Sequence, residues 1–356
     1  MQNQRLTMPG FRSAADVVRW FGAIQSQDLA SSLYAIGLRT RDASQATVEH
    51  AIAARSIVRT WPMRRTIHCV PAEDARWMVH LLAPRRIARM AVYYRRLEIT
   101  NHDLDRAGKV LHSALAGGNQ LSRPEVYREL NAAGIATDGP AGISRGLHFI
   151  AHWAQMGLIC MASRKGKQPT FALLDEWVPR SRELSGDEAY AELATRYFQS
   201  HGPATVADFA WWSGLTMPEA KRSLCLIVNS LKSFSIDGTD YWLTREHSDA
   251  PATPWPVLLL PAFDEYTVGY ADRSAAADAS TLKTVNHGLM ANILINGRIA
   301  GIWKRAISAK NVIFIDAKLL RGLTGKERVG LARATERYAT FLGGTLLREK
   351  FDASLR

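Results

Sequence analysis

Two glutamines separated by one residue are the side chains whose types and spacing point most directly to chemistry. Gln25 and Gln27 follow a short apolar segment and flank Ser26. On extended backbone, residues i and i+2 point to the same side, so the two amides are expected to converge on one small target, such as a water molecule or a base edge. Each amide offers two donor hydrogens and an acceptor oxygen. The alternative is that both are solvated or cap nearby backbone groups.

The neighbouring acid, Asp28, has two alternative roles. A carboxylate beside the glutamines could assist as a base. An acid directly before a helix is also a preferred N-cap, because its oxygen accepts hydrogen bonds from the first free amides of the helix. We favour the N-cap.

A basic turn at residues 163–169 carries Arg164, Lys165 and Lys167 between two segments that predict a β-hairpin. A cationic hairpin commonly grips DNA phosphates, although a basic turn is often only solvated. Arg59, Arg64 and Arg65 form a second basic group, for which we also expect phosphate contact.

The composition is that of an ordered protein with a polyanionic partner. The 356 residues are 47% hydrophobic and carry a net charge of +12, with a pI of about 9.8. Nucleic acid or an acidic membrane surface would satisfy this charge. No window approaches eighteen uninterrupted apolar residues, and no signal peptide is visible, so we expect a cytoplasmic, nucleoid-associated protein without a membrane span.

Known catalytic and cofactor motifs are missing from the sequence. It contains no G-x-S-x-G, H-E-x-x-H, P-loop or G-x-G-x-x-G pattern. Cys69, Cys160 and Cys225 lie far apart, and none is near a histidine at metal-ligand spacing. We therefore expect no metal, no cofactor and no disulfide.

The clearest local architecture lies at residues 203–244. Thr205 and Asp208 open one helix, which Gly214 ends, and Thr216 and Glu219 form a capping box for another. A hairpin follows, with Asp237-Gly238 as its turn. Helix, tight turn, helix and hairpin is the order of a winged helix.

The same order recurs upstream. A capping box at 121–125 opens a helix to about Ala133, a second helix is predicted from Ala141 to Met156, and the basic hairpin follows. A third copy fits the N-terminus, with helices near 13–22, 28–37 and 45–55 before extended chain at 57–70. We expect a tandem repeat of one unit. The alternative is a generic α+β protein, since capping boxes and Asp-Gly turns occur in most folds.

After a proline-rich linker at 251–256 the pattern changes. A strand at 257–260, a hairpin turning at Asn296-Gly297, another strand at 312–315 and a helix at 326–341 predict a β-rich unit. The predicted fold is thus α+β and mainly helical, with three winged-helix units at 1–115, 116–180 and 181–250 and a β-rich subdomain at 251–356.

Four stretches resemble the AlkZ-like family of bacterial DNA glycosylases. Residues 22–28 are similar to the family's Gln-x-Gln signature, residues 59–74 to its extended hairpin, residues 260–273 to its C-terminal signature and residues 296–305 to a hairpin downstream. The stretches keep the family's order, and the resemblance runs from about residue 10 to about residue 345.

The resemblance implies three tandem winged helices in a C-shaped arrangement around a DNA channel. It implies hydrolysis of the N-glycosidic bond of alkylated purines, with Gln25 and Gln27 as the catalytic pair that orients water at C1′. It also places His68 in the extended hairpin, where we expect channel contact. Two residues depart from the family pattern. The family usually has an aliphatic residue at the position of Ser26, so the packing behind the glutamine pair differs here. It commonly has glycine at the position of Arg65, so the surface of the hairpin is altered.

The expected partner is double-stranded DNA with alkylated bases, bound by a monomer. One rival is a transcription regulator that reads DNA without catalysis, but regulators normally dimerise and carry one winged helix per subunit. Another is a passive DNA-binding protein whose glutamines are structural. The lesion stays open among simple N7-alkylpurines, bulky adducts and interstrand crosslinks, as does base flipping.

Overall fold

A computed structural model describes residues 1–7, 10–64, 66–139, 144–166, 168–245, 257–308 and 310–352. The chain divides into two compact units: Met1–His50 with Ala191–Arg356, and Ala51–Tyr190. Among the described residues, none of the helices combines the length and the hydropathy needed to cross a membrane. The predicted linker at 251–256 lies outside the described residues.

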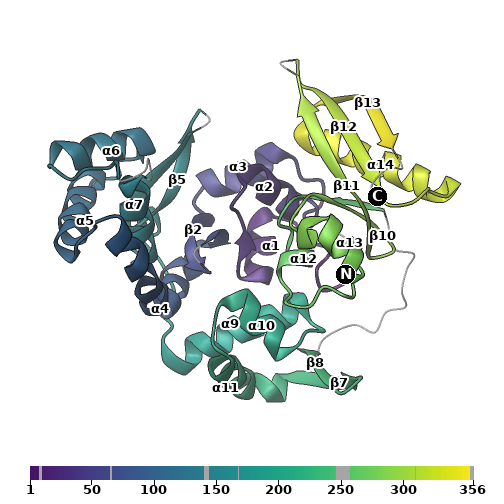
Figure 1. Cartoon of the computed structure of the whole chain (residues 1–356), viewed down its shortest axis with the longest axis horizontal. Coiled ribbons are helices and arrows are strands. Elements are labelled where there is room, and N and C mark those ends of the chain that lie inside the picture. The colour runs from purple at the N-terminus through teal and green to yellow at the C-terminus, as the bar shows by residue number, and fades with distance from the viewer. Residues whose placement is uncertain are drawn as a thin grey trace. The chain divides into compact units, whose positions relative to one another are not determined.

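The unit formed by residues 51–190 is built on an antiparallel sheet with helices packed against it (Figure 1). Its strands occur in the order β3-β2-β5-β6-β4. They are β2 (Ile57–Met63), β3 (Thr66–Pro71), β4 (Leu121–Ser122), β5 (Ile159–Lys165) and β6 (Gln168–Leu173). The helices are η1 (Ala72–Asp74), α4 (Ala75–Arg96), α5 (Asn101–Leu115), α6 (Arg123–Ala132), α7 (Arg145–Gln155) and α8 (Leu174–Trp177).

The core of this unit forms where the helices α4 to α7 meet the sheet. In α5, Leu104, Leu111 and Leu115 recur at helical spacing and are buried. A polar pair lies in the same core, where the Tyr94 hydroxyl of α4 and the His152 Nδ1 of α7 are 2.9 Å apart. Burial lowers the pKa of His152 to about 4.

The helical part of the other unit joins the N-terminal helices to a helix pair and its hairpin. The helices are α1 (Ala14–Phe21), α2 (Leu29–Gly37), α3 (Gln45–Ala53), α9 (Gly186–His201), α10 (Val206–Ser213), α11 (Met217–Ile227) and η3 (Val228–Ser230). The strands are β1 (Ile24–Gln25), β7 (Leu231–Ile236) and β8 (Thr239–Thr244). Helices α3 and α9 each extend across the boundary between the units.

The same unit contains a sheet in the order β13-β12-β11-β10-β9. Its strands are β9 (Leu258–Leu260), β10 (Asn292–Ile295), β11 (Arg298–Ile307), β12 (Val312–Leu319) and β13 (Thr345–Asp352). Its helices are α12 (Glu265–Val268), α13 (Ala279–Thr284), η4 (Asn286–Gly288) and α14 (Gly325–Leu342). Tyr338 of α14 packs edge-on against Trp303 of β11 and Tyr34 of α2, so an aromatic cluster links the N-terminal helices to this sheet.

The predicted capping boxes and hairpins are confirmed. Side-chain and backbone bonds join Thr205 to Asp208, Thr216 to Glu219 and Ser122 to Glu125. The helices predicted near 13–22, 28–37, 45–55 and 326–341 are present, as are the hairpin turns at Asp237-Gly238 and Asn296-Gly297.

The extended chain predicted at 57–70 is present as the strands β2 and β3, which pair as the hairpin that the family resemblance implies, with a turn in which Arg64 has a φ of 49°. Two expectations differ in detail. Ala141, the predicted first residue of a helix, lies outside the described residues; the helix described there, α7, begins at Arg145, and the Ser144 side chain caps it by accepting from the Leu147 amide. The β-rich segment contains one strand that was not predicted, β13, which pairs in parallel with β12. The structure is a mixed arrangement of helices and sheets, and the division into four segments stays a prediction.

Candidate active site

The glutamine pair lies on the short connection between α1 and α2. Helix α1 ends at Gly22, whose φ is 74°, and α2 begins after Asp28, whose side chain accepts from the Ser31 amide at 2.7 Å. The predicted N-cap role of Asp28 is confirmed. Gln25 is half-buried and Gln27 is exposed.

The intervening Ser26 is fully buried, so burial alternates along the connection as it does along extended backbone. The Ser26 hydroxyl lies 2.8 Å from the Ser32 hydroxyl of α2, and Ser32 donates in turn to the Leu29 carbonyl at 2.8 Å. The unusual serine therefore meets a second serine instead of an apolar contact. Its polar atom is satisfied inside the protein.

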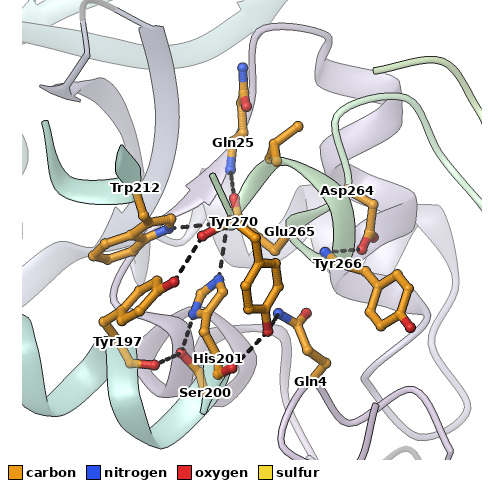
Figure 2. Close-up of polar contacts among 12 residues, drawn as sticks. Gln4, Gln25, Tyr197, Ser200, His201, Trp212, Asp264, Glu265, Tyr266 and Tyr270 are labelled. Atoms are coloured by element: carbon orange, nitrogen blue, oxygen red, sulfur yellow. Dashed lines mark hydrogen bonds and ion pairs between the residues drawn. The ribbon is translucent and has the colours of Figure 1, made fainter. Parts of the chain in front are cut away.

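The backbone of Gln25 is bonded to a buried carboxylate. The Gln25 amide donates to Glu265 Oε1 at 2.7 Å, and Glu265 is fully buried. Figure 2 shows the Gln25 side-chain amide pointing away from Glu265. The bond thus fixes the base of the side chain and leaves the amide group itself for another partner.

The other oxygen of Glu265 faces two nitrogen atoms. Trp212 Nε1 of α10 donates to Glu265 Oε2 at 3.1 Å, and His201 Nε2 of α9 lies 3.3 Å from the same oxygen. His201 Nδ1 is 2.8 Å from the Ser200 hydroxyl. Its ring stacks on Tyr197, with the centroids 4.6 Å apart and the planes at 11°. A buried carboxylate is tolerated only with such partners.

The residue before Glu265 anchors the end of α2. Asp264 accepts from both terminal nitrogens of Arg39, at 2.8 and 2.9 Å, and both side chains are buried. Arg39 also donates to the Ala35 carbonyl and to Gln4. A bidentate pair of this kind has strict geometry, so Asp264 and Glu265 together fix α2 and the connection before it.

Tyr270, from the same segment, closes the cluster. Its hydroxyl donates to the His201 carbonyl at 2.7 Å and accepts from Gln4 Nε2 at 3.4 Å. Burial raises the pKa of the Tyr270 phenol. The cluster under the glutamines is therefore formed by the N-terminal segment, α9, α10 and residues 264–270.

The residues predicted to bind DNA belong to the unit formed by residues 51–190. Arg164 and Lys165 are exposed at the end of β5, and Lys165 Nζ lies 3.4 Å from Glu125 Oε1. Hydrogen bonds from Ser122, with the nearby charge of Lys165, lower the pKa of Glu125 to about 2. Lys167 and Arg65 lie outside the described residues.

The remaining predicted contacts lie on or beside the β2–β3 hairpin. Arg64 is half-buried at its turn. Arg59 and His68 are buried within the strands, with exposed fractions of 7% and 0%, and His68 Nδ1 is 3.0 Å from the Thr66 carbonyl. In this arrangement Arg59 and His68 present little surface to a phosphate.

Residues that sequence reasoning missed are those beneath the glutamines: Glu265, His201, Trp212 and the Asp264–Arg39 pair. One signal was present, because Asp264 and Glu265 are adjacent acids inside a stretch used for the family resemblance. Among the described residues, no group of three or more His, Cys, Asp or Glu side chains is arranged to hold a metal ion.

A family model described as DNA glycosylase AlkZ-like matches residues 18–341. This chain belongs to the AlkZ-like DNA glycosylase family. It is accordingly a DNA glycosylase, a DNA-repair enzyme, and DNA is its substrate.

Individual relatives of this AlkZ-like enzyme agree with the family match. The chain is 23% identical over 320 residues to the interstrand DNA cross-link repair glycosylase of Streptomyces sahachiroi. The aligned residues cover 85% of each protein. It is also similar in structure to the DNA glycosylase AlkZ of Streptomyces sahachiroi, with a TM-score of 0.80, 21% identity and coverage of 99% of this chain and 96% of that one. The second comparison establishes a shared fold.

Proposed function

We propose that this AlkZ-like enzyme hydrolyses the N-glycosidic bond of purines alkylated at N7, with Gln25 and Gln27 orienting the attacking water. The observation that carries the proposal is a pair of glutamines, Gln25 half-buried and Gln27 exposed, on a connection in which the backbone amide of Gln25 is bonded to a buried carboxylate. Catalysis by positioning requires that the backbone carrying the catalytic side chains is held in place.

Two neutral amides suit this substrate. An N7-alkylated purine already carries positive charge and is a good leaving group, so proton removal in advance of bond cleavage is not needed. Amide oxygens can accept hydrogen bonds from the water, hold it beside C1′ and stabilise its developing positive charge. The C1′–O bond forms as the C1′–N9 bond breaks, the alkylated purine leaves as a neutral base, and the attacking water releases its extra proton to solvent. Asp28 is engaged as a helix cap and takes no part in the proposed step.

The proposed DNA-binding elements are three winged helices. A hairpin follows each of three groups of helices along the chain: β2–β3 after α1–α2–α3, β5–β6 after α5–α6–α7, and β7–β8 after α9–α10–α11. Helices followed by a hairpin are the order of a winged helix. We propose that Arg164, Lys165 and Lys167 on the second hairpin contact phosphates. Arg64, at the β2–β3 turn, is proposed to do the same, together with Arg65, the next residue in the sequence.

Arg59 and His68 take a different place in the proposal, because they are buried in the strands of that hairpin. We propose that they support its shape along the DNA channel. The enzyme is proposed to act as a monomer on double-stranded DNA.

The proposed substrate range includes bulky adducts and interstrand crosslinks, because the Streptomyces sahachiroi relative is named for crosslink repair. A set of otherwise identical duplexes carrying N7-methylguanine, a bulky N7 adduct or an N7–N7 crosslink ranks these substrates. Alkaline cleavage reveals the abasic sites formed.

The test of the catalytic pair is mutation under single-turnover conditions. Gln25→Ala and Gln27→Ala should each slow excision of an N7-alkylguanine by roughly ten- to a thousandfold, the effect expected when one preorganised polar interaction is removed from the transition state. DNA affinity should barely change. The double variant should lose less than the product of the single losses, because two residues that hold one water are not independent.

Two further variants sharpen this test. Gln27→Glu keeps an acceptor oxygen and removes the amide donor, so retained activity would show that the acceptor is what matters. Gln45→Ala in α3 removes a glutamine amide that bonds to Glu49 in its own helix, and should excise at the wild-type rate. Wild-type rates for both catalytic-pair alanine variants would show that the pair is structural.

A further inference from the structure

The geometry points to Glu265 as a positioning residue for Gln25, acting through the backbone amide of Gln25. The inference rests on the proposed function for its catalytic consequence. It adds a buried carboxylate, 240 positions away in sequence, to the residues that set the rate of excision.

The bond between Gln25 and Glu265 is short and has a charged acceptor. The Gln25 amide and Glu265 Oε1 are 2.7 Å apart, and a carboxylate is a stronger acceptor than a neutral oxygen, particularly where water is excluded. The amide nitrogen is attached directly to the Cα atom from which the Gln25 side chain starts. Fixing this nitrogen therefore restricts where the side-chain amide can reach.

Glu265 is itself immobilised by its neighbours. Its other oxygen bonds to Trp212 Nε1 and lies 3.3 Å from His201 Nε2. Its chain neighbour Asp264 is locked to Arg39 by two bonds. The carboxylate cannot follow a displaced Gln25, so it acts as a fixed reference point.

The helix at the other end of the connection is anchored as well. Arg39 follows α2, so its pairing with Asp264 fixes the helix that begins after Gln27 and Asp28. Glu265 thus anchors Gln25, and the adjacent Asp264 anchors α2, the helix that follows Gln27. A misplacement of about 1 Å in a catalytic group can cost on the order of a hundredfold in rate, which makes this anchoring relevant to catalysis.

The isosteric variant Glu265→Gln separates positioning from packing. It keeps the volume of the side chain but replaces one acceptor oxygen by a donor NH₂ group. That group faces either the Gln25 amide or the Trp212 indole N–H, both of which are donors. If the new side chain at position 265 keeps its oxygen towards Trp212, its NH₂ group faces the Gln25 amide, and the bond to Gln25 is lost.

The matched control is Tyr197→Phe. The Tyr197 hydroxyl donates to the Gly269 carbonyl at 3.0 Å in the same cluster, and its removal keeps the ring that stacks on His201. The control thus weakens a neighbouring buried bond without altering an acceptor of Gln25. A second variant, Trp212→Phe, loosens Glu265 from the opposite side and keeps its charge.

The experiment combines hydrogen exchange at the Gln25 amide, measured on the free protein, with single-turnover excision and DNA affinity. For Glu265→Gln we expect exchange at Gln25 to rise at least tenfold, excision to slow by roughly ten- to a hundredfold and the DNA Kd to stay within twofold. Trp212→Phe should show smaller changes of the same kind. Tyr197→Phe should leave exchange at Gln25 and the excision rate unchanged.

If Glu265→Gln turns its NH₂ group towards Trp212 and His201, its oxygen still accepts from the Gln25 amide, so Glu265→Leu, which has no acceptor in either orientation, is measured beside it. Unchanged exchange at Gln25 in both variants would overturn the inference, as would faster exchange in either variant with an excision rate equal to that of the Tyr197→Phe control. If Glu265→Gln does not fold, Trp212→Phe decides by the same two criteria. A wild-type enzyme that excises no N7-alkylpurine would refute the proposed function, and exchange at Gln25 would then still decide whether Glu265 fixes this residue.

Discussion

For single residues, the most informative contrast is between the two carboxylates near the glutamine pair. Asp28 is exposed and caps α2, whereas Glu265 is buried and binds the backbone of Gln25. One oxygen of Asp28 accepts from the Ser31 amide, and both oxygens of Glu265 have hydrogen-bond partners inside the protein. The catalytic contribution of this site is therefore expected from the amides, with the acids controlling the backbone around them.

The cap role of Asp28 gives a test by substitution. Asp28→Ala should lower the free energy of unfolding by about 0.5–2 kcal/mol, the range for losing an N-cap, and Asp28→Ser should restore most of it, because serine is also a good cap. Urea unfolding measures both. If Asp28 were the base, the serine variant would excise as slowly as the alanine variant; we expect it to excise at the wild-type rate.

The cap was predictable from the sequence because it depends on neighbouring residues: an acid directly before a helix indicated it. The spacing of Gln25 and Gln27 at i and i+2 predicts that their side chains lie on one side, which is likewise a local pattern. The bond between Gln25 and Glu265 joins residues 240 positions apart, and no local pattern specifies which buried acid meets which backbone amide.

For secondary-structure elements, the same distinction holds. Helices α6, α10 and α11 were predicted with their first residues because capping boxes and N-terminal proline are local signals. The parallel pairing of β13 with β12 was not predicted, because α14 separates the two strands in sequence. Periodicity indicated only extended chain at β2 and β3, and the hairpin was expected from the family resemblance, since its turn depends on Arg64 adopting a positive φ.

The β5–β6 hairpin carries a prediction about DNA binding. Replacing Arg164, Lys165 and Lys167 with alanine should lower the slope of log affinity against log salt by roughly two to three, because each phosphate that the protein neutralises adds about 0.9 to the slope. Fluorescence anisotropy with an undamaged duplex at several salt concentrations measures the slope.

The control for this prediction removes the same charge from another element. Lys326, Arg328 and Arg333 are exposed on α14, and their replacement by alanine should change the slope less than the hairpin variant does. Equal slopes for the two triple variants would mean that the hairpin contributes only net charge.

For the whole molecule, the two compact units do not follow the order of the sequence. Residues 1–50 belong to the same compact unit as residues 191–356, and the buried pair of Arg39 with Asp264 spans 225 positions within it. Repeat patterns along the sequence predicted the succession of helices and hairpins, but they carry no information about which repeats share a core. That grouping depends on tertiary packing of surfaces such as the one formed by Tyr34, Trp303 and Tyr338.

The stability of the molecule should depend on pH through the unit formed by residues 51–190. Burial lowers the pKa of His152 to about 4, while an unfolded chain has a histidine pKa near 6.5. The unfolded state therefore binds a proton first as the pH falls. The contribution of neutral His152 to stability is fully present above about pH 6.5 and is lost progressively as the pH falls to about 4.

Urea unfolding of wild type and His152→Gln at several pH values tests this prediction. The variant, which does not titrate at this position, should be less stable at pH 7.5, because the interaction with Tyr94 is disturbed. The difference should shrink as the pH falls from about 6.5 to 4, by at most about 1.4 kcal/mol per pH unit. Phe149→Leu weakens the same core without a titrating group, so its difference from wild type should be independent of pH. A constant difference for His152→Gln as well would show that His152 does not set the acid limit of this unit.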